Sequence, residues 1–402
     1  MIPELDDRRS ALRVAAALAL GAAVSLGLAR FSYALLLAPM RADLGWSYLT
    51  AGAMNTVNAG GYLVGALLAP RWLARFDARA ALLAGSAAAA LLLAAHGAAS
   101  DDAALYLLRL ATGVASAAAF VSGGLLAARL AATHPRSSGL TLGIYYGGTG
   151  LGIVASALLA PPLIAMPAAQ GWRWAWVALG VAAAVSTAFI AANTRALAAP
   201  PARAADRVPF DWRPFAPGLA GYFMFGLGYI GYMTFVIALL REQQLGTTQI
   251  VAFFVLLGAG VVASSWLWAG LLQRCRGGEA LALLNGLLAL ATVLPVFGAH
   301  PLLVYASGLL FGSVFLSVVA STTSLVRHNL PAALWPGGIS AFTIVFAAGQ
   351  IIGPSAVGWI ADGSGGLQRG LASSALALAL GAALAWRQKP LHTVAMTGSG
   401  RP

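Results

Sequence analysis

The amino-acid sequence predicts an all-helical membrane protein of about twelve spanning helices, arranged as two six-helix bundles related by a parallel repeat. Its 402 residues are 60% hydrophobic and 9% charged, and the mean hydropathy is +0.82. Soluble domains carry about 25% charged residues. Lipid leaves backbone groups unsatisfied, and no segment alternates as a membrane strand does, so helices are the expected structure.

The second observation is an internal repeat. Tyr33 and Tyr232 are 199 residues apart, and so are Tyr106 and Tyr305. Repeats of this kind are typical of secondary transporters, whose site lies between two similar bundles. We expect an N-terminal bundle over residues 1–196, a cytoplasmic linker over 197–213 and a C-terminal bundle over 214–402. The linker is rich in Pro, Ala and Arg and is too polar to cross a membrane.

Each predicted span is an apolar run bounded by charges, prolines or glycines. About 20 apolar residues are needed to cross the hydrocarbon core. In the first half these runs cover residues 14–39, 48–70, 80–99, 103–128, 139–165 and 174–195. In the second half they cover residues 216–240, 249–272, 279–298, 301–326, 338–361 and 369–386. Ser47 and Thr247 stand at span starts as expected N-caps.

Basic residues gather in the loops on one side of the predicted membrane. With the N-terminus in the cytoplasm, eighteen Arg and Lys residues lie in inside segments, and only Arg41, Arg173, Arg241 and Arg369 lie outside. The positive-inside rule therefore places both termini in the cytoplasm. This distribution also explains the net charge of +12. It argues against a nucleic-acid partner, because the charges form no soluble face, and leaves the lipid bilayer as the surroundings.

Two arginines lie inside predicted spans, at similar depth in the outer half of the membrane. Arg30 is in the first span and Arg109 is in the fourth. Charge at such depth costs about 2.5–3.5 kcal/mol on insertion scales and marks function by default. All 12 acidic residues lie outside the spans, so a substrate carboxylate or phosphate is the expected partner, through bidentate pairing. The alternative is a structural arginine held by carbonyls or tyrosines, and for Arg109 this alternative is equally strong.

Further polar and aromatic residues lie on the same spans. The side chains expected to shape a site beside the arginines are Tyr33, Asn58, Tyr229, Tyr232 and Gln350. Tyr222, Phe225, Tyr229 and Tyr232 follow helical spacing, which suits either a ligand wall or simple packing. Three acidic residues at outer span ends, Asp43, Glu242 and Asp362, are candidates for gate or proton-binding positions.

Glycines are dense in the fifth and eleventh spans. Gly148, Gly150 and Gly152 predict close helix packing. Gly349, Gly353 and Pro354 predict a helix that packs closely and bends, because the proline frees a backbone carbonyl. We expect these positions to serve as gating or helix-bending points.

The sequence shows no catalytic constellation. The histidines near span ends have no cysteine or carboxylate at ligand spacing, and no serine has a partnered base. The sequence therefore predicts a protein that is not an enzyme and that uses neither a metal nor a cofactor.

Four segments carry a resemblance to a known family. They are Gly27-Leu28-Ala29-Arg30-Phe31-Ser32-Tyr33, Asn58-Ala59-Gly60-Gly61-Tyr62-Leu63-Val64-Gly65, Phe225-Gly226-Leu227-Gly228-Tyr229-Ile230 and Gly349-Gln350-Ile351-Ile352-Gly353-Pro354. The chain resembles the major facilitator superfamily over nearly its whole length, and within it the YbfB/YjiJ-like branch of bacterial transporters. This resemblance implies the major facilitator fold, a location in the bacterial inner membrane, and a central cavity lined by spans one, four, seven and ten. We also expect the protein to be a monomer.

The superfamily's motifs are matched in part. Arg109, with Gly113 one turn later, resembles the fourth-span motif, and the fifth-span glycines resemble another. The loop after span two retains Gly65, Arg71, Arg75 and Arg79 of a cytoplasmic loop motif. Ala69 stands where the superfamily usually has an Asp.

The expected function is therefore secondary active transport of a small organic anion by alternating access. Arg30 would be the primary counter-ion and Arg109 the secondary one, with a proton or another ion as the coupling ion. One alternative is a broad-specificity exporter of lipophilic compounds. The other is a non-transporting membrane sensor or scaffold.

Overall fold

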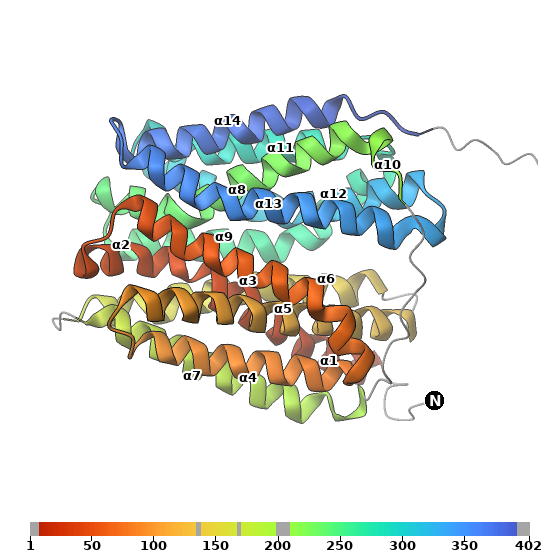
Figure 1. Cartoon of the computed structure of the whole chain (residues 1–402), viewed down its shortest axis with the longest axis horizontal. Helices are drawn as coiled ribbons and strands as arrows, with labels where there is room; N and C mark the ends of the chain where they lie inside the picture. Colours follow the sequence, from red (N-terminus) through yellow and green to blue (C-terminus); the bar gives the residue numbers. More distant parts are fainter. Residues whose placement is uncertain (1–7, 134–137, 167–169, 198–209, 392–402) are drawn as a thin grey trace, which may run out of the picture.

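A computed structural model describes residues 8–133, 138–166, 170–197 and 210–391 of the chain. The predicted fold class is confirmed. Within these residues the protein is helical without strands, and twelve spanning segments form two six-helix bundles lying side by side (Figure 1).

The first bundle contains the first six spanning segments. Its helices are α1 (Arg8–Ala22), the π-helical segment η2 (Ala23–Phe31), α2 (Tyr33–Leu44), α3 (Tyr48–Arg75), α4 (Ala78–His96), α5 (Asp102–Thr133), α6 (Ser138–Ile164), α7 (Gly171–Asn193) and the 3-10 turn η4 (Arg195–Leu197). The first span consists of α1, η2 and α2 together. The sequence predicted a shorter span over 14–39 and gave no sign of the π segment.

The second bundle repeats this order after the short turn η5 (Arg213–Phe215). Its helices are α8 (Ala216–Glu242), α9 (Thr247–Leu267), α10 (Ala269–Arg274), α11 (Glu279–Val293), the turn η6 (Leu294–Phe297), α12 (Pro301–Asn329), the turn η7 (Ala332–Leu334), α13 (Trp335–Ala361) and α14 (Gly366–Trp386). α10 extends α9 towards the loop, and η6 completes the span begun by α11.

Eleven of the described segments are long and apolar enough to cross a membrane. The remaining one, α3, is 28 residues long, which gives a rise of about 42 Å against a hydrocarbon core of about 30 Å. Its composition is more polar because Asn55 and Asn58 lie in its first half. Both side chains are buried inside the protein, so α3 spans as part of the bundle.

Helix packing shows the repeat directly. In the first bundle α3 packs on α5, α4 on α7 and α1 on α6, and the matching pairs in the second bundle are α9 on α12, α11 on α14 and α8 on α13. The bundles meet where α3 contacts α13, α6 contacts α9 and α2 contacts α8. The proposed domain boundaries stay a prediction, and most of the linker, residues 198–209, lies outside the described residues.

Glycines permit the closest helix crossings. A Cβ on Gly150 would collide with the Gly258 carbonyl of the opposite bundle, and Gly27 and Gly152 stand backbone to backbone between η2 and α6. Gly148 lies against the Ala19 carbonyl of α1. The fifth-span glycines therefore provide close packing both inside the first bundle and across the bundle interface.

The glycines of the eleventh span contact the neighbouring helix of their own bundle. Gly349 and Gly353 lie against the backbone of α8 at Phe223 and Leu227. Pro354 lies inside α13, which continues from Trp335 to Ala361 without a break. A bending role for these positions stays a prediction.

One expected helix cap is confirmed and the other is wrong. The Ser47 side chain accepts the amide hydrogen of Thr50 (3.0 Å) as the N-cap of α3. Thr247, by contrast, is the first residue inside α9, and Gly246 is the N-cap. The Gln249 side chain accepts the Gly246 amide hydrogen (2.9 Å), so a threonine cap is not needed there.

Candidate functional site

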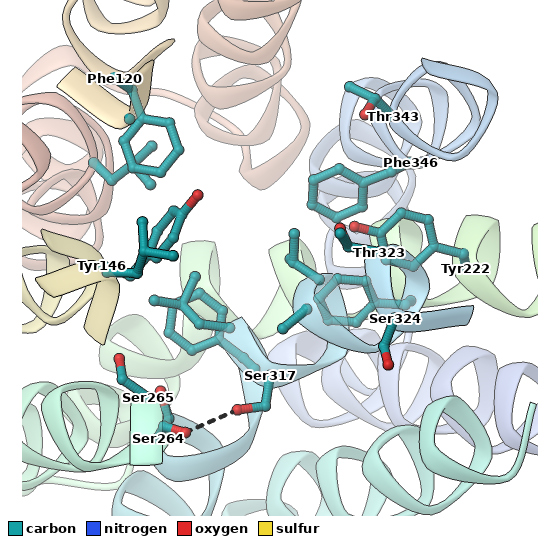
Figure 2. Close-up of a pocket in the computed structure, with 18 of the residues that line it drawn as sticks. Phe120, Tyr146, Tyr222, Ser264, Ser265, Ser317, Thr323, Ser324, Thr343 and Phe346 are labelled. Carbon is teal, nitrogen blue, oxygen red and sulfur yellow. Dashed lines mark hydrogen bonds between the residues drawn. The ribbon is translucent and has the colours of Figure 1, made fainter. Parts of the chain in front are cut away.

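A cavity of about 1020 Å³ lies between the two bundles. Figure 2 shows Phe120 and Tyr146 of the first bundle on one side and Tyr222 and Phe346 of the second bundle on the other. At one end the cavity reaches the exposed residue His328, near the end of α12. The cavity is therefore open at the end of the molecule where the α5–α6 and α12–α13 connections lie.

Arg30 lines this cavity and is only 3% exposed. Its guanidinium atoms Nε and Nη2 have no hydrogen-bond partner, and the ring of Tyr62 lies 5.6 Å from its Cζ. Unpaired buried donors cost about 1–3 kcal/mol each, and more when they carry charge. Arg30 belongs to the π-helical segment, and such segments occur frequently at functional sites.

The second bundle supplies an aromatic wall, defined here as Tyr222, Phe225, Tyr229, Phe315 and Phe346. The rings of Phe225 and Tyr229 stack with centroids 4.7 Å apart, and Phe346 stacks on Phe225 at 5.3 Å. Phe315 adds a nearly parallel ring at 6.0 Å from Tyr229. All five line the cavity. Three members of the seventh-span aromatic series thus contribute to a cavity wall.

Gln350 of α13 lines the cavity next to the aromatic wall and donates a hydrogen bond to the Tyr229 hydroxyl. Phe31, the residue after Arg30, packs edge to face on Phe315, and the Phe315 ring in turn stacks on Tyr229. Arg30 of the first bundle therefore lies near Tyr229 of the second. Of the predicted site residues, Arg30, Tyr229 and Gln350 come together at the cavity.

Hydroxyl groups also line the cavity. The labelled residues Ser265, Thr323, Ser324 and Thr343 all contribute to this lining. Nearby, the Ser317 hydroxyl donates to the Ser264 carbonyl (3.1 Å), as the dashed line in Figure 2 shows. These groups add polar atoms to a largely aromatic lining.

Arg109 does not line the cavity. Its Nη1 donates to the Ala29 carbonyl (3.1 Å), its Nη2 to Asn55 Oδ1 (3.1 Å) and its Nε to the Met54 carbonyl (3.4 Å). The Tyr33 ring lies 4.7 Å from its Cζ. The protein itself supplies partners for this guanidinium, so the geometry favours the structural alternative for Arg109.

Three other predicted site residues also lie away from the cavity. The Tyr33 hydroxyl donates to the Ala51 carbonyl (2.8 Å) and Asn58 Nδ2 donates to the Arg109 carbonyl (3.0 Å), both inside the first bundle. The Tyr232 hydroxyl is bonded to Ser307 Oγ (2.6 Å) inside the second. Each polar group is therefore satisfied within its own bundle.

Beyond Arg30, hydrogen bonds between the bundles close the cavity's other end. Asn55 Nδ2 donates to Thr234 Oγ1 (2.7 Å), and Thr56 Oγ1 donates to the Ile351 carbonyl (2.7 Å). Thr56 also lies 2.9 Å from the hydroxyl of Ser355. These bonds join the first half of α3 to the second halves of α8 and α13. We call this region the outer seal.

Two of the carboxylates suggested as gate positions belong to the outer seal. The Asp362 carboxylate accepts the amide hydrogens of Tyr48 (2.7 Å) and Leu49 (2.8 Å) at the start of α3. Glu242 accepts a hydrogen bond from the Tyr48 hydroxyl. The third candidate, Asp43, instead accepts from Trp172 Nε1 (2.8 Å) within the first bundle.

The cytoplasmic loop motif is separate from the cavity. Arg71 and Arg75 are exposed, whereas Arg79 donates to the Ala191 carbonyl (2.9 Å) and ties α4 to α7. Gly65 lies against Val114 and Ala117 of α5. Among the described residues no group of His, Cys, Asp and Glu could hold a metal ion.

Sequence reasoning missed several cavity residues. On α13 the cavity-lining residues Thr343, Phe346, Ala347 and Gln350 are spaced as one helical face, a pattern that was available in the sequence. Tyr62 lies in one of the four segments that resemble the family, and nothing else in the sequence marks it as a cavity residue. Phe120 and Tyr146 carried no signal, because single aromatic residues are common on packed and lipid-facing surfaces.

The chain is similar to solved structures of membrane transporters. A bacterial homolog of the human lysosomal transporter Spinster, inward-facing and unoccupied, matches with a TM-score of 0.71 and 14% identity over 94% of this chain and 97% of that one. The nucleoside transporter NupG matches with a TM-score of 0.72 and 13% identity over 94% and 100%. The human organic anion transporter MFSD10 (TETRAN) matches with a TM-score of 0.64 and 16% identity over 93% and 99%. At these identities the likeness establishes the fold alone.

No curated protein matches the chain. A family model described as "Uncharacterised MFS-type transporter YbfB" matches residues 22–386, from the last residue of α1 to the last residue of α14. With two six-helix bundles around a central cavity, this multi-pass membrane protein belongs to the YbfB-like family of major facilitator transporters.

Proposed function

We propose that this transporter moves a small organic anion across the bacterial inner membrane by alternating access, as a monomer. Arg30 is the observation that carries the proposal. It is a buried guanidinium on a central cavity with two nitrogens uncommitted to the protein. Intramembrane charge of this kind marks substrate pathways.

The free nitrogens of Arg30 form the edge that recognises carboxylates. The Nε–H bond and one Nη2–H bond lie along the same edge of the planar guanidinium group, and this pair can donate two parallel hydrogen bonds to one carboxylate. Among the described residues that line the cavity there is no Asp or Glu. An anion entering the cavity therefore meets a guanidinium without a competing protein carboxylate.

The asymmetry of the cavity supports alternating access. It is open beside the ends of α10 and α12 and closed by the outer seal. The positive-inside rule assigns the open end to the cytoplasm, together with both termini, which makes this an inward-open arrangement. A proton or another ion would be the coupling ion, and Asp362 and Glu242 of the outer seal are the carboxylates placed to respond to it.

The proposal is tested by comparing anion binding and flux between the wild-type protein and Arg30→Gln. Purified protein is screened by thermal shift against organic anions and lipophilic cations, and hits are tested for uptake into proteoliposomes. We expect an anion that raises the melting temperature by binding the folded state, with affinity reduced about tenfold or more in the variant.

Arg13→Gln is the control, because Arg13 is an exposed arginine near the start of the same span. We expect it to bind and transport as the wild type does. Unchanged anion uptake by Arg30→Gln would contradict the proposed counter-ion.

The aromatic wall and the cavity volume favour a second candidate, a broad-specificity exporter of lipophilic compounds. Ring faces attract cations, but Arg30 opposes them. Stabilisation by lipophilic cations that is equal in the wild type and in Arg30→Gln would favour this exporter and make Arg30 structural.

A further inference from the structure

Among the described residues that line the cavity, Arg30 is the single deep cation. Arg30 is buried beside Tyr229, whereas Arg327 and His328, which also line the cavity, are exposed at its open end. One guanidinium edge pairs with one carboxylate. A second carboxylate held at the same depth would have no cationic partner, and burying an unpaired charge is costly. The charge inventory therefore fits a monoanion.

The surfaces next to Arg30 are aromatic on both sides. The aromatic wall of the second bundle faces Phe31, Tyr62, Phe120 and Tyr146 of the first. Phe31 meets Phe315 edge to face at 5.7 Å, so the two aromatic sets already touch across the bundles below the open part of the cavity. An aromatic ring of a ligand, placed between this contact and the open end of the cavity, would stack on the rings of the aromatic wall.

The cavity is also large for a small ion. Its volume of about 1020 Å³ is at the upper end of the range of about 300–1,000 Å³ for sites that bury drug-sized ligands. An inorganic ion or a two-carbon acid would leave the aromatic wall in contact with water. A ligand with an extended apolar body would displace that water from ring surfaces, which is favourable.

Building on the proposed anion transport, we propose that the substrate class is a lipophilic aromatic monoanion. Its carboxylate pairs with Arg30 of the first bundle, and its rings lie against Tyr229 and Phe346 of the second. The ligand thereby contacts both bundles at once. Aromatic cations of the same shape are rejected by Arg30, and aromatic dianions by the lack of a second deep cation.

The test uses four probes with purified full-length protein and isothermal titration near neutral pH. They are 2-naphthoate, 2,6-naphthalenedicarboxylate, 2-naphthylmethylammonium and propionate. We expect 2-naphthoate to bind at least about tenfold more tightly than each of the others. Arg30→Gln should weaken its binding about tenfold or more, and Phe346→Leu should weaken it several-fold through lost stacking. Arg13→Gln, on the same span but outside the cavity, should bind it as the wild type does.

The outcomes separate this inference from the proposed function. If propionate binds as tightly as 2-naphthoate and both depend on Arg30, the aromatic class is wrong and the anion site stands. Tighter binding of the dicarboxylate would overturn the single-charge assignment. Tightest binding of the ammonium probe, unchanged in Arg30→Gln, would overturn both proposals. Binding of none of the four would overturn the inference alone, provided that Arg30-dependent uptake of another anion is measured in proteoliposomes.

Discussion

Arg30 and Arg109 lie at similar depth in the membrane, yet the protein treats them differently. Arg109 donates to the backbone carbonyls of Ala29 and Met54 and to the side-chain oxygen of Asn55. Arg30 keeps Nε and Nη2 without partners. Because Asn55 in turn donates to Thr234 of the opposite bundle, Arg109 also fixes the orientation of one amide in the outer seal. Arg109, whose guanidinium is hydrogen-bonded to the protein, therefore supports the structure. Arg30, with Nε and Nη2 unpaired, is available to a ligand.

This difference predicts opposite effects on stability in the absence of ligand. Arg109→Met should lower the free energy of unfolding by about 1–3 kcal/mol or more, because it strands buried acceptors. Arg30→Met should leave the melting temperature unchanged or raise it, because it removes a buried cation that lacks partners. Thermal unfolding of the two purified variants in the same detergent checks this. A larger loss of stability in Arg30→Met would mean that Arg30 is the structural arginine.

At the scale of elements, the N-terminus of α3, whose N-cap is Ser47, is also bonded to a carboxylate of the other bundle. Its first amides donate to Asp362, at the C-terminal end of α13. A carboxylate at a helix N-terminus satisfies orphan donors and interacts favourably with the helix dipole. These bonds exist only while the bundles are together at this end, so their free energy contributes only to the arrangement in which this end is closed, which is the inward-open one of the proposed mechanism.

Asp362→Asn should therefore loosen the outer seal. Cap interactions of about 0.5–2 kcal/mol correspond to a shift of a few-fold to about thirtyfold between the two arrangements. Spin labels at Ala103→Cys and Gln368→Cys, both exposed positions, would measure the distance between the bundles in a Cys275→Ser background. We expect a larger population with a long distance in Asp362→Asn.

The matched control for this experiment is Asp101→Asn. Asp101 accepts the amide hydrogen of Ala104 (2.9 Å) at the start of α5, within its own bundle. Losing this local cap should leave the distance distribution unchanged. An equal shift in both variants would mean that charge alone, rather than the cap between bundles, sets the distance.

At the scale of the whole molecule, the two bundles meet where α3 contacts α13, α6 contacts α9 and α2 contacts α8, and the first two of these contacts differ in character. The α3–α13 contact is joined at the outer seal, and residues further along both helices line the cavity. The α6–α9 contact stays close, because Gly150 stands against Gly258 and Gly143 against Trp266. If the bundles rock as proposed, the tight glycine crossing between α6 and α9 must either stay intact or separate during the motion.

Gly150→Ala should lower both the melting temperature and the transport rate. Its added Cβ would collide with the Gly258 carbonyl, and overpacking typically costs about 1–3 kcal/mol. Gly147→Ala, on the same helix, is the control, because its Cβ would meet Val262 at an ordinary 3.8 Å. Thermal unfolding and proteoliposome flux compare the two. Equal tolerance of both substitutions would contradict a tight crossing at Gly150.

Much of the fold could be predicted from the sequence, because apolar runs and loop charges are local signals. Helix ends such as Gly246 were less predictable, because the Gln249 side chain, three residues later, accepts the Gly246 amide hydrogen. The candidate site was predictable only in part. The position of an arginine within a predicted span marks it as unusual. Whether its guanidinium has hydrogen-bond partners depends on groups such as the Ala29 carbonyl, which tertiary packing brings close to Arg109. Gln350 and Tyr229 met Arg30 for the same reason, from segments far apart in the chain.

The π-helical segment that contains Arg30 also has a consequence for the first span as a whole. α1 packs on α6 of its own bundle, whereas α2 contacts α8 of the other. The nine residues of η2 therefore determine how α2 is rotated about the span axis relative to α1. One of these helices packs inside the first bundle and the other against the second. Each residue added to or removed from this stretch would turn one helix by about 100° relative to the other. In the proposed mechanism, a ligand bound at Arg30 would therefore contact the segment that joins a helix packed inside the first bundle to a helix packed against the second.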